Sequence, residues 1–214
     1  MSAPTSPPQP TVEDTTEVGT GTIYGTLARL YEEPSEELFA ALDSGSLFAD
    51  LRRLTQKTDL EVTVPSVETD DEYTLLCARF NDLFVVGYPD PVIPRYESEH
   101  VETEWEQVNL DLTRVYDYFD VEIDQEEREH HDYLVIELEF AGYLSRLAAT
   151  GDPAAKRARA DFIERHLLPF VEGLEASIAG EQNTGIYRDI VDFTADFVRA
   201  DLGHLRQELE DPTE

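Results

Sequence analysis

The segment 126–150 constrains the fold of this chain more than any other. Apolar side chains recur in it at helical spacing on two adjacent faces: Leu134, Leu138, Ala141 and Leu144 on one, and Ile136, Phe140, Tyr143 and Leu147 on the other. A helix with so wide an apolar surface must be covered by other elements around most of its circumference. Gly151-Asp152-Pro153 then ends this helix and starts the next one. We therefore predict a central helix over 126–150, enclosed by its neighbours.

The rest of the chain also shows helical rather than strand periodicity. Further helices are expected at about 22–33, 35–42, 47–54, 67–84, 101–119, 153–178 and 187–202, with a kink or break at Pro169. Residues 58–66 alternate polar and apolar side chains, a pattern that favours a strand when taken alone. A lone strand has nothing to pair with, so an extended loop is predicted there. The fold class that follows is an all-α globular domain of roughly eight or nine helices.

The two ends of the chain differ in composition from its middle. Residues 1–18 are rich in Pro, Thr, Ser and Glu and predict a disordered tail, and residues 208–214 form a second polar tail. The 214 residues are enough for one helical domain, which we place at 19–207. A polar break at 120–125 predicts a hinge near 120–132. A monomer is expected, or a domain-swapped dimer if that hinge opens.

The charge of the chain is extreme, because 47 acidic side chains accompany only 16 lysines and arginines and leave a net charge of −31. Self-repulsion of this size weakens a compact fold at low salt, whereas at about 1 M salt the Debye length falls to about 3 Å. The alternatives are an acidic tail or a nucleic-acid mimic, but a tail would gather into blocks the acids that are here interleaved with apolar positions. We infer a halophilic protein. No basic patch is visible, so nucleic acid is not an expected partner.

Nothing in the sequence predicts export or insertion into a membrane. The N-terminus lacks the basic and apolar regions of a signal peptide, and no stretch approaches the roughly 20 apolar residues that span a bilayer. Cys77 is the only cysteine and lies in an apolar stretch, which predicts a buried, inert thiol and excludes an internal disulfide. A cytoplasmic protein is therefore expected.

The densest polar cluster is the segment 126–132, which holds His130 and His131 among acidic residues. Two adjacent histidines could bind a metal, and a helical metal-dependent enzyme is accordingly one hypothesis. Neighbouring side chains on a helix point about 100° apart, however, and no His-x-x-x-His pair is present. A solvated helix start, with acids at its favourable N-terminal end, explains the same residues.

The other polar residues offer no catalytic constellation. Glu137 and Glu139 are two residues apart and so face different directions on a helix, and Glu139 is expected to be partly buried. His166 and His204 are expected at helix surfaces without evident partners. No phosphate-binding loop or nucleophile elbow is present. The chain is therefore predicted not to be an enzyme, and neither a cofactor nor a metal is expected.

The proline-rich segment 88–98 combines tyrosines with charged residues. Pro89, Pro91 and Pro94 exclude a helix there. Neither this segment nor residues 130–133 are needed to fill a core, and tyrosines mixed with charged groups suit recognition of another polypeptide. Two interpretations stay open, namely a specific binding surface and an ordinary surface crossover in a generic helical interaction protein.

Four stretches, in this order, resemble the TorD/DmsD/NarJ family of molybdoenzyme maturation chaperones, with the acidic composition of a haloarchaeal-type member. They are residues 24–34, an opening helix that ends at a proline; 73–98, where Phe80-Asn81-Asp82-Leu83-Phe84 precedes the proline-rich loop and Pro94-Arg95-Tyr96-Glu97-Ser98 closes it; 132–140, an Asp-Tyr pair followed by a Leu-Glu-Phe helix; and 162–170, a His-Leu segment. Each stretch is weak alone, and the ordered set is fairly specific. The resemblance implies a TorD-like all-helical fold and a non-enzymatic role.

By this resemblance, the partner is the catalytic subunit of a molybdopterin-dependent oxidoreductase of the DMSO/TMAO or nitrate reductase type. Family members bind its twin-arginine leader peptide or its apoprotein until the cofactor is inserted, before export. The implied peptide-binding residues are Tyr96, Glu97, Ser98, Asp132 and Tyr133, to which we add His131. Asp132 and Glu97 could pair with arginines of the leader. His130 and His131 stand where the family has a proline, and Tyr133 looks more like the nitrate reductase branch, so leader binding and apoprotein binding both stay open.

Overall fold

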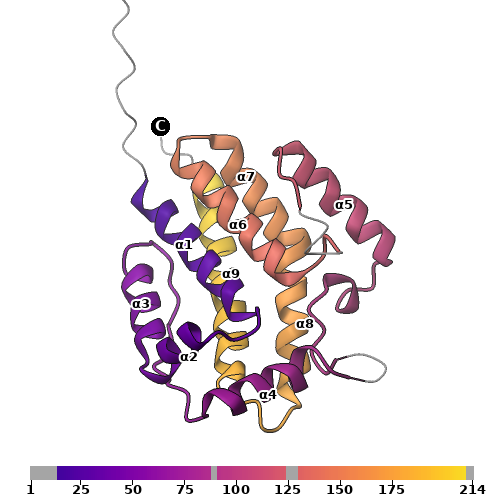
Figure 1. Ribbon diagram of the computed structural model, residues 1–214. Helices are drawn as coiled ribbons and strands as arrows, with labels where there is room; N and C mark the ends of the chain where they lie inside the picture. Colours follow the sequence, from indigo (N-terminus) through magenta and orange to yellow (C-terminus); the bar gives the residue numbers. More distant parts are fainter. Residues whose placement is uncertain (1–13, 88–90, 124–129, 211–214) are drawn as a thin grey trace, which may run out of the picture.

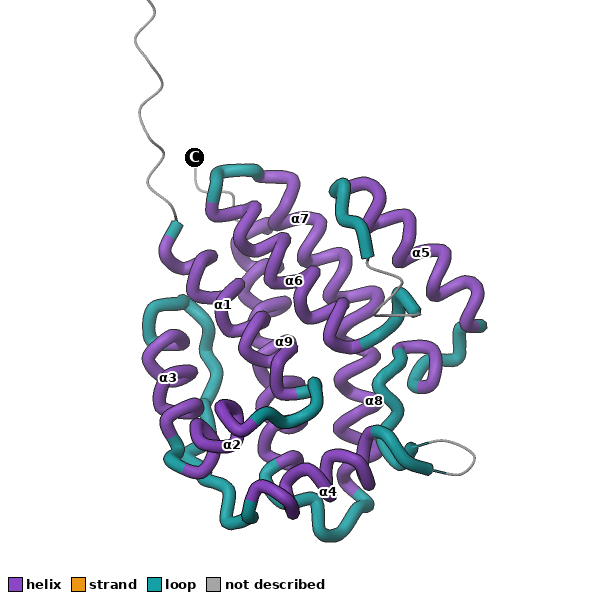
Figure 2. Tube along the Cα trace, viewed as in Figure 1, coloured by secondary structure: helices purple, strands orange, loops and turns teal. Residues whose placement is uncertain are grey.

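The computed structural model of the protein describes residues 14–87, 91–123 and 130–210. Helices dominate these ranges, which hold no strand beyond two isolated bridges (Figures 1 and 2). The α-helices in chain order are α1 (Thr15–Leu30), α2 (Glu36–Asp43), α3 (Ser46–Thr55), α4 (Tyr73–Phe84), α5 (Trp105–Tyr118), α6 (Leu134–Ala149), α7 (Pro153–Phe162), α8 (Leu168–Ala179) and α9 (Tyr187–Glu210). A 3₁₀ turn, η1 (Glu97–Glu99), and a π-helical turn, η2 (Ile163–Leu167), complete the set. The predicted all-α fold is confirmed.

Helix α6 lies at the centre, as its two apolar faces predict. α1 and α7 pack along it, and α8 and α9 pack against each other behind them (Figure 1). Both predicted faces are buried, apart from half-buried Tyr143 and Leu147. The helix begins at Leu134 rather than at the expected 126, because residues 131–133 form a turn that is bonded to another segment. Residues 124–129 lie outside the described ranges.

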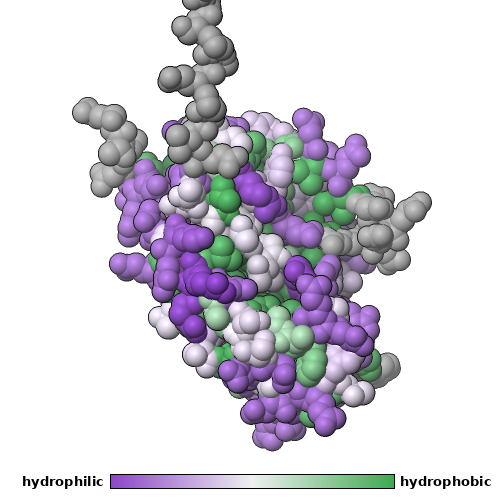
Figure 3. All heavy atoms as spheres, turned by 60° about the vertical axis from the view of Figure 1, so that its left-hand side comes forward, coloured by the Kyte–Doolittle hydropathy of each residue, from purple (hydrophilic) through white to green (hydrophobic). Residues whose placement is uncertain are grey.

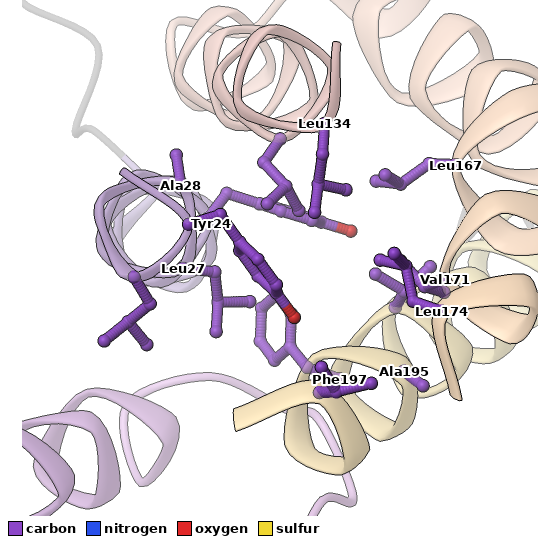
Figure 4. Close-up of a cluster of buried hydrophobic side chains, with 14 of the residues drawn as sticks. Tyr24, Leu27, Ala28, Leu134, Leu167, Val171, Leu174, Ala195 and Phe197 are labelled. Carbon is purple, nitrogen blue, oxygen red and sulfur yellow. The ribbon is translucent and has the colours of Figure 1, made fainter. Parts of the chain in front are cut away.

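The core forms where α1, α6, α8 and α9 converge. In Figure 4, Tyr24 and Leu27 of α1 face the apolar side chains of α8 and Phe197 of α9, with Leu134 of α6 on a third side. The rings of Tyr24 and Phe197 meet edge to face, with centroids 4.9 Å apart. Full burial of an apolar side chain of this size stabilises the fold by about 1.5–3 kcal/mol. This converging core fixes how the central helix sits against its neighbours.

A buried ion network joins three of these helices. Arg159 of α7 forms ion pairs with Glu17 of α1 and with Asp201 of α9, whose carboxylate lies 3.1 Å from the guanidinium. Tyr24 donates a hydrogen bond of 2.8 Å to Asp201, and Ser145 donates one of 2.8 Å to Glu17. Burial alone would raise the pKa of Glu17, but the charge and hydrogen bond of Arg159 outweigh it and leave that pKa below its ordinary value. The network therefore holds an ionised Glu17 inside the protein.

The same network explains why α1 begins at Thr15, earlier than the expected start near Thr22. The Asp14 side chain caps the helix by accepting a hydrogen bond from the Thr16 N–H at 3.0 Å. Glu17, in the first turn, points into the interior and forms an ion pair with Arg159 of α7. Residues 15–18 of the predicted tail are thus helical, and residues 1–13 lie outside the described ranges. At the other end, α9 extends to Glu210 and includes residues 208–210 of the predicted polar tail.

Other boundaries also differ from expectation. The extended loop predicted at 58–66 is confirmed, and it continues to residue 72, so α4 begins at Tyr73 rather than at 67. Asp71, just before α4, pairs with Arg79 of this helix at 2.7 Å. α5 begins at Trp105 rather than at 101. The predicted hinge near 120–132 falls partly outside the described ranges and stays a prediction.

The surface toward α1, α2 and α3 is brought forward in Figure 3. Hydrophilic side chains cover most of it, and apolar side chains gather in its central hollow. A pocket between these three helices is lined by none of the predicted site residues. Cys77 is half-buried rather than buried, with Sγ 4.0 Å from the carbonyl oxygen of Pro34. In the described part of the chain, no helix combines the length and apolar character needed to cross a membrane.

Candidate functional site

Two segments far apart in the sequence cross at the N-terminal end of α6, beside α5 (Figure 1). The Glu97 N–H donates to the carbonyl of Asp132 at 2.9 Å, and the Leu134 N–H donates to the carbonyl of Arg95 at 3.0 Å. Tyr96 and Tyr133 form an antiparallel bridge between these bonds. We call residues 95–98 and 131–134 the crossover. Its geometry brings together all six residues that the sequence assigned to a peptide site.

Ser98 and Asp132 lock the crossover through their side chains. The Ser98 hydroxyl donates to Asp132 Oδ2 at 2.6 Å, and the Ser98 N–H points at the same oxygen from 3.3 Å. Asp132 is completely buried, and its Oδ1 has no hydrogen-bond partner among the described residues. Asp132 is thus an internal acceptor for its own loop.

Glu97 also points inward, toward η2. Its carboxylate oxygens lie 3.1 and 3.2 Å from Nδ1 of His166, and both side chains are buried. The expectation that His166 sits on a surface without a partner is therefore wrong. It failed because the partner, Glu97, comes from a loop whose path the helical pattern does not reveal. His204 likewise has a neighbour, Glu208, at 3.7 Å.

Behind the crossover lies Glu137, in the first turn of α6. Its side chain is completely buried, whereas Glu139 is exposed, so the expectation of a partly buried Glu139 is wrong. The start of α6 at Leu134 turns Glu137 toward the interior and Glu139 toward solvent. Burial first, and then the negative charges of Glu97 and Asp132, raise the pKa of Glu137 well above its usual range.

The outer side of the crossover is a row of aromatic rings, which we call the aromatic face: Tyr96, Trp105, His130 and Tyr133. The ring of His130 lies between Tyr96 and Trp105, with centroids 5.4 and 5.7 Å away, and Tyr96 lies 5.6 Å from Tyr133. Tyr96 is 38% exposed and Trp105 47% exposed. Trp105 was missed from the sequence, although it is the only tryptophan of the chain and stands at a helix start outside the core pattern.

Arg95 supports this face from below. One guanidinium nitrogen donates to the Tyr31 carbonyl and to the Tyr133 hydroxyl, each at 2.6 Å. The guanidinium also lies over the rings of Phe80 and Tyr133, 5.1 and 5.2 Å from their centroids. Arg95 thereby ties the crossover to the ends of α1 and α4.

The two adjacent histidines go to different neighbours. The His131 N–H donates to the Asn109 side chain at 3.1 Å, and its ring stacks on Tyr116 with centroids 6.2 Å apart. His130 faces outward, toward Tyr96 and Trp105. Within the described residues, no group of three or more His, Cys, Asp or Glu side chains is arranged to hold a metal. Residues 126–129, three of them glutamates, lie outside those ranges.

His100 anchors the end of η1 on α8. Its Nε2 lies 2.8 Å from the Pro94 carbonyl, and its ring packs on Phe170 at 5.4 Å. This contact needs Gly173, because a Cβ at that position would lie 2.5 Å from the Cβ of His100. The crossover is therefore held by α8 as well as by α6.

Together these contacts divide the predicted site residues into two layers. Tyr96, Tyr133 and His131 are at least partly accessible, whereas Glu97 and Asp132 are buried. Direct pairing of Glu97 or Asp132 with arginines of an incoming peptide is therefore not available in this conformation. The arrangement can present flat aromatic and cation-accepting surface to a partner, with buried carboxylates holding it in place.

Comparison with known proteins gives three relatives and one family. The family described as "Nitrate reductase delta subunit" matches residues 34–176, a range that contains the whole crossover. The chain is 27% identical over 206 residues to the perchlorate reductase assembly chaperone protein of Dechloromonas aromatica (strain RCB), which covers 87% of this chain and 90% of that protein. It is 30% identical over 115 residues to the chlorate reductase assembly chaperone protein of Ideonella dechloratans, covering 50% of this chain and 59% of the relative. It is also 40% identical over 63 residues to the selenate reductase assembly chaperone protein of Thauera selenatis, covering 27% and 33%.

Proposed function

The chain belongs to the nitrate reductase delta subunit family, and from this premise we propose that it is an assembly chaperone for a molybdopterin-dependent oxidoreductase. Three relatives named as reductase assembly chaperones support this proposal, one of them along most of both chains. They are named for assembly rather than for catalysis, which favours a protein that is not an enzyme over the metal-dependent alternative. The observation that carries the proposal is the exposed aromatic face, which the hydrogen bonds of the crossover hold together.

The partner is the catalytic subunit of the reductase, recognised through a segment that is cationic and then apolar, such as a twin-arginine leader. Exposed aromatic rings attract guanidinium groups through their faces and also accept apolar side chains. Glu99, Glu102, Glu104 and Glu106 are exposed around Trp105 and favour a cationic segment over an acidic one. In concentrated salt, long-range attraction is screened, so ring contacts and apolar burial supply most of the affinity.

The predicted site residues then have distinct roles. Tyr96 and Tyr133, together with His131 at the edge, contact the peptide. Ser98, Glu97 and Asp132 hold the crossover so that the rings stay in place. The protein acts in the cytoplasm, where a subunit would receive its cofactor before export.

The test is a titration with leader peptides of reductase catalytic subunits in concentrated KCl. Trp105→Ala and Tyr96→Ala should each raise the Kd by about tenfold or more, as for aromatic residues at the centre of an interface. Tyr118→Ala is the matched control, because Tyr118 is 76% exposed at the far end of the same helix. Equal affinities for all variants would remove the aromatic face from the site. Absence of binding to any leader and to any reductase subunit would leave a generic helical interaction protein.

A further inference from the structure

Three buried carboxylates lie together behind the crossover. The Glu97 N–H bonds to the Asp132 carbonyl at 2.9 Å, the Glu137 N–H bonds to the carbonyl of Tyr133, the residue after Asp132, at 3.2 Å, and the charges of Glu97 and Asp132 both act on Glu137. Glu97, Asp132 and Glu137 are 2%, 0% and 0% exposed, and they come from η1, from the turn before α6 and from α6 itself. Asp132 Oδ1 and both oxygens of Glu137 have no hydrogen-bond partner among the described residues. No arginine or lysine of the described ranges forms an ion pair with any of the three.

Three negative charges in one buried cluster repel each other and have lost their hydration. Within the described residues the cluster lacks the geometry of a metal site, so a proton is the group that can remove one of its three charges. Glu137 is the member that best holds this proton, because no donor among the described residues satisfies its ionised form, whereas Glu97 contacts His166 and Asp132 accepts from Ser98. A neutral carboxyl at Glu137 gives the cluster a donor where it otherwise contains only acceptors.

We propose that Glu137 is a positioning residue whose neutral carboxylic acid holds the two segments of the crossover together and thereby sets the aromatic face. When Glu137 loses its proton, repulsion from Glu97 and Asp132 releases residues 95–98 from residues 131–134. The crossover is then a proton-controlled latch beneath the surface that meets the partner. The latch depends only on the cluster, while its consequence for peptide binding rests on the proposed function.

Several elements around Glu137 bring titratable groups that affect the loss of its proton. η1 brings Glu97, the turn before α6 brings Asp132, and α5 brings the buried hydroxyl of Tyr116, whose pKa is raised by burial and then by these three carboxylates. η2 brings His166, which faces Glu97 rather than Glu137. Of the two charged residues of α1, Glu17 is engaged by Ser145 and Arg159 near the opposite end of α6, and Arg29 is exposed and lies 3.9 Å from Glu37.

Closure of the latch is linked to binding of the Glu137 proton, so it depends on pH. The closed latch binds the Glu137 proton more tightly than an open, hydrated latch does, because burial and the neighbouring charges raise its pKa. Closure is therefore complete at low pH and is lost as the pH rises through that raised pKa.

Trp105 provides a reporter that is independent of any partner, since it is the only tryptophan and lies against His130 of the aromatic face. Its emission should change with pH in the wild-type protein, at constant high salt and with α-helical circular dichroism unchanged. Glu137→Gln, which is neutral at every pH, should abolish this transition and keep the low-pH emission throughout. Glu139→Gln is the matched control, two residues along the same helix and exposed, and should keep the wild-type profile.

An unchanged transition in Glu137→Gln, or no transition in the wild-type protein, overturns the proposal. Hydrogen exchange of the wild-type protein decides the matter if Glu137→Gln does not fold. Protection of the Glu97 and Leu134 amides, relative to amides of α9, should fall as the pH rises, and a constant ratio overturns the latch. A latch that opens without any change in leader affinity would instead count against the proposed function.

Discussion

Gly21 of α1 and Gly142 of α6 face each other so closely that a Cβ on Gly21 would lie 2.9 Å from the carbonyl oxygen of Gly142, and a Cβ on Gly142 3.0 Å from that of Gly21. A side chain at either position would therefore meet the backbone of the facing helix and push the two helices apart. This contact lies on the central helix that the whole fold surrounds.

Gly142→Ala should consequently destabilise the protein, because the added methyl group meets backbone that cannot move aside without separating α1 from α6. We expect a loss of about 1–3 kcal/mol, the usual cost of overpacking a core. Thermal unfolding in concentrated salt would measure it, at about 2–4 °C per kcal/mol for a chain of this size. Gly203→Ala is the control, since nothing lies within 4 Å of its added Cβ in helix α9. That variant should be neutral or slightly more stable, and an equal loss in both variants would contradict the close approach of α1 and α6.

Arg159→Leu should cost about 3–5 kcal/mol in denaturant unfolding, because it leaves Glu17 and Asp201 buried without their cation. Adding Glu17→Gln and Asp201→Asn to Arg159→Leu should restore part of the loss. If the triple variant is as unstable as Arg159→Leu alone, the cost lies in packing rather than in charge.

The network also predicts how acid acts on this region. The folded-state pKa of Glu17 lies below its ordinary value of 4.5, so the stability that it contributes is fully present above 4.5 and is lost as the pH falls through the lowered value. Glu17→Gln should therefore flatten the acid limb of a plot of unfolding free energy against pH. The exposed Glu106→Gln, outside the network, should leave that limb unchanged.

Ser98→Ala should loosen the crossover by removing the hydroxyl that donates to Asp132. Only the longer bond from the Ser98 N–H, at 3.3 Å, then remains on Oδ2 of Asp132, and the loss of a donor by a buried acceptor costs about 1–3 kcal/mol. We expect Trp105 emission to shift and peptide affinity to fall, while Ser98→Thr, which keeps the hydroxyl, should stay close to wild type. Identical emission in all three proteins would mean that this bond does not position the aromatic face.

The net charge of −31 predicts that the unfolding midpoint rises steeply as KCl is added from low concentration. Urea titrations at increasing KCl would measure this dependence. Potassium sulfate at matched ionic strength separates screening from the effect of salt on hydrophobic burial. A midpoint independent of KCl would refute the halophilic interpretation.

The sequence patterns that predicted this fold correctly are local ones. The two apolar faces of α6, the prolines and the loop at 58–66 act within a few turns of the chain, and the order of four short stretches was enough to identify the family that the match at 34–176 confirms. Helix starts were less predictable. Glu17 in the first turn of α1 pairs with Arg159, and Asp71 just before α4 pairs with Arg79, and neither contact leaves a periodic signal.

The sequence predicts which residues form the candidate site, but it does not predict which of their side chains point inward and which face solvent. Tyr96, Asp132 and their neighbours do come together, yet only the fold reveals that Glu97 and Asp132 point inward. Glu137 and His166 are both neighbours of Glu97, through contacts between segments far apart in the sequence. Trp105 carried no helical periodicity because it packs against a histidine of another segment rather than against the core.

The π-helical turn η2 fixes the rotational phase between α7 and α8. Arg159 lies before it and reaches Glu17 and Asp201, whereas His166 lies within it and reaches Glu97. Each helical residue advances the chain by about 100° around the axis. Deleting or inserting one residue between these two side chains would therefore turn one of them away from its partner. The number of residues between Arg159 and His166 is therefore as much a part of the fold as the two side chains themselves.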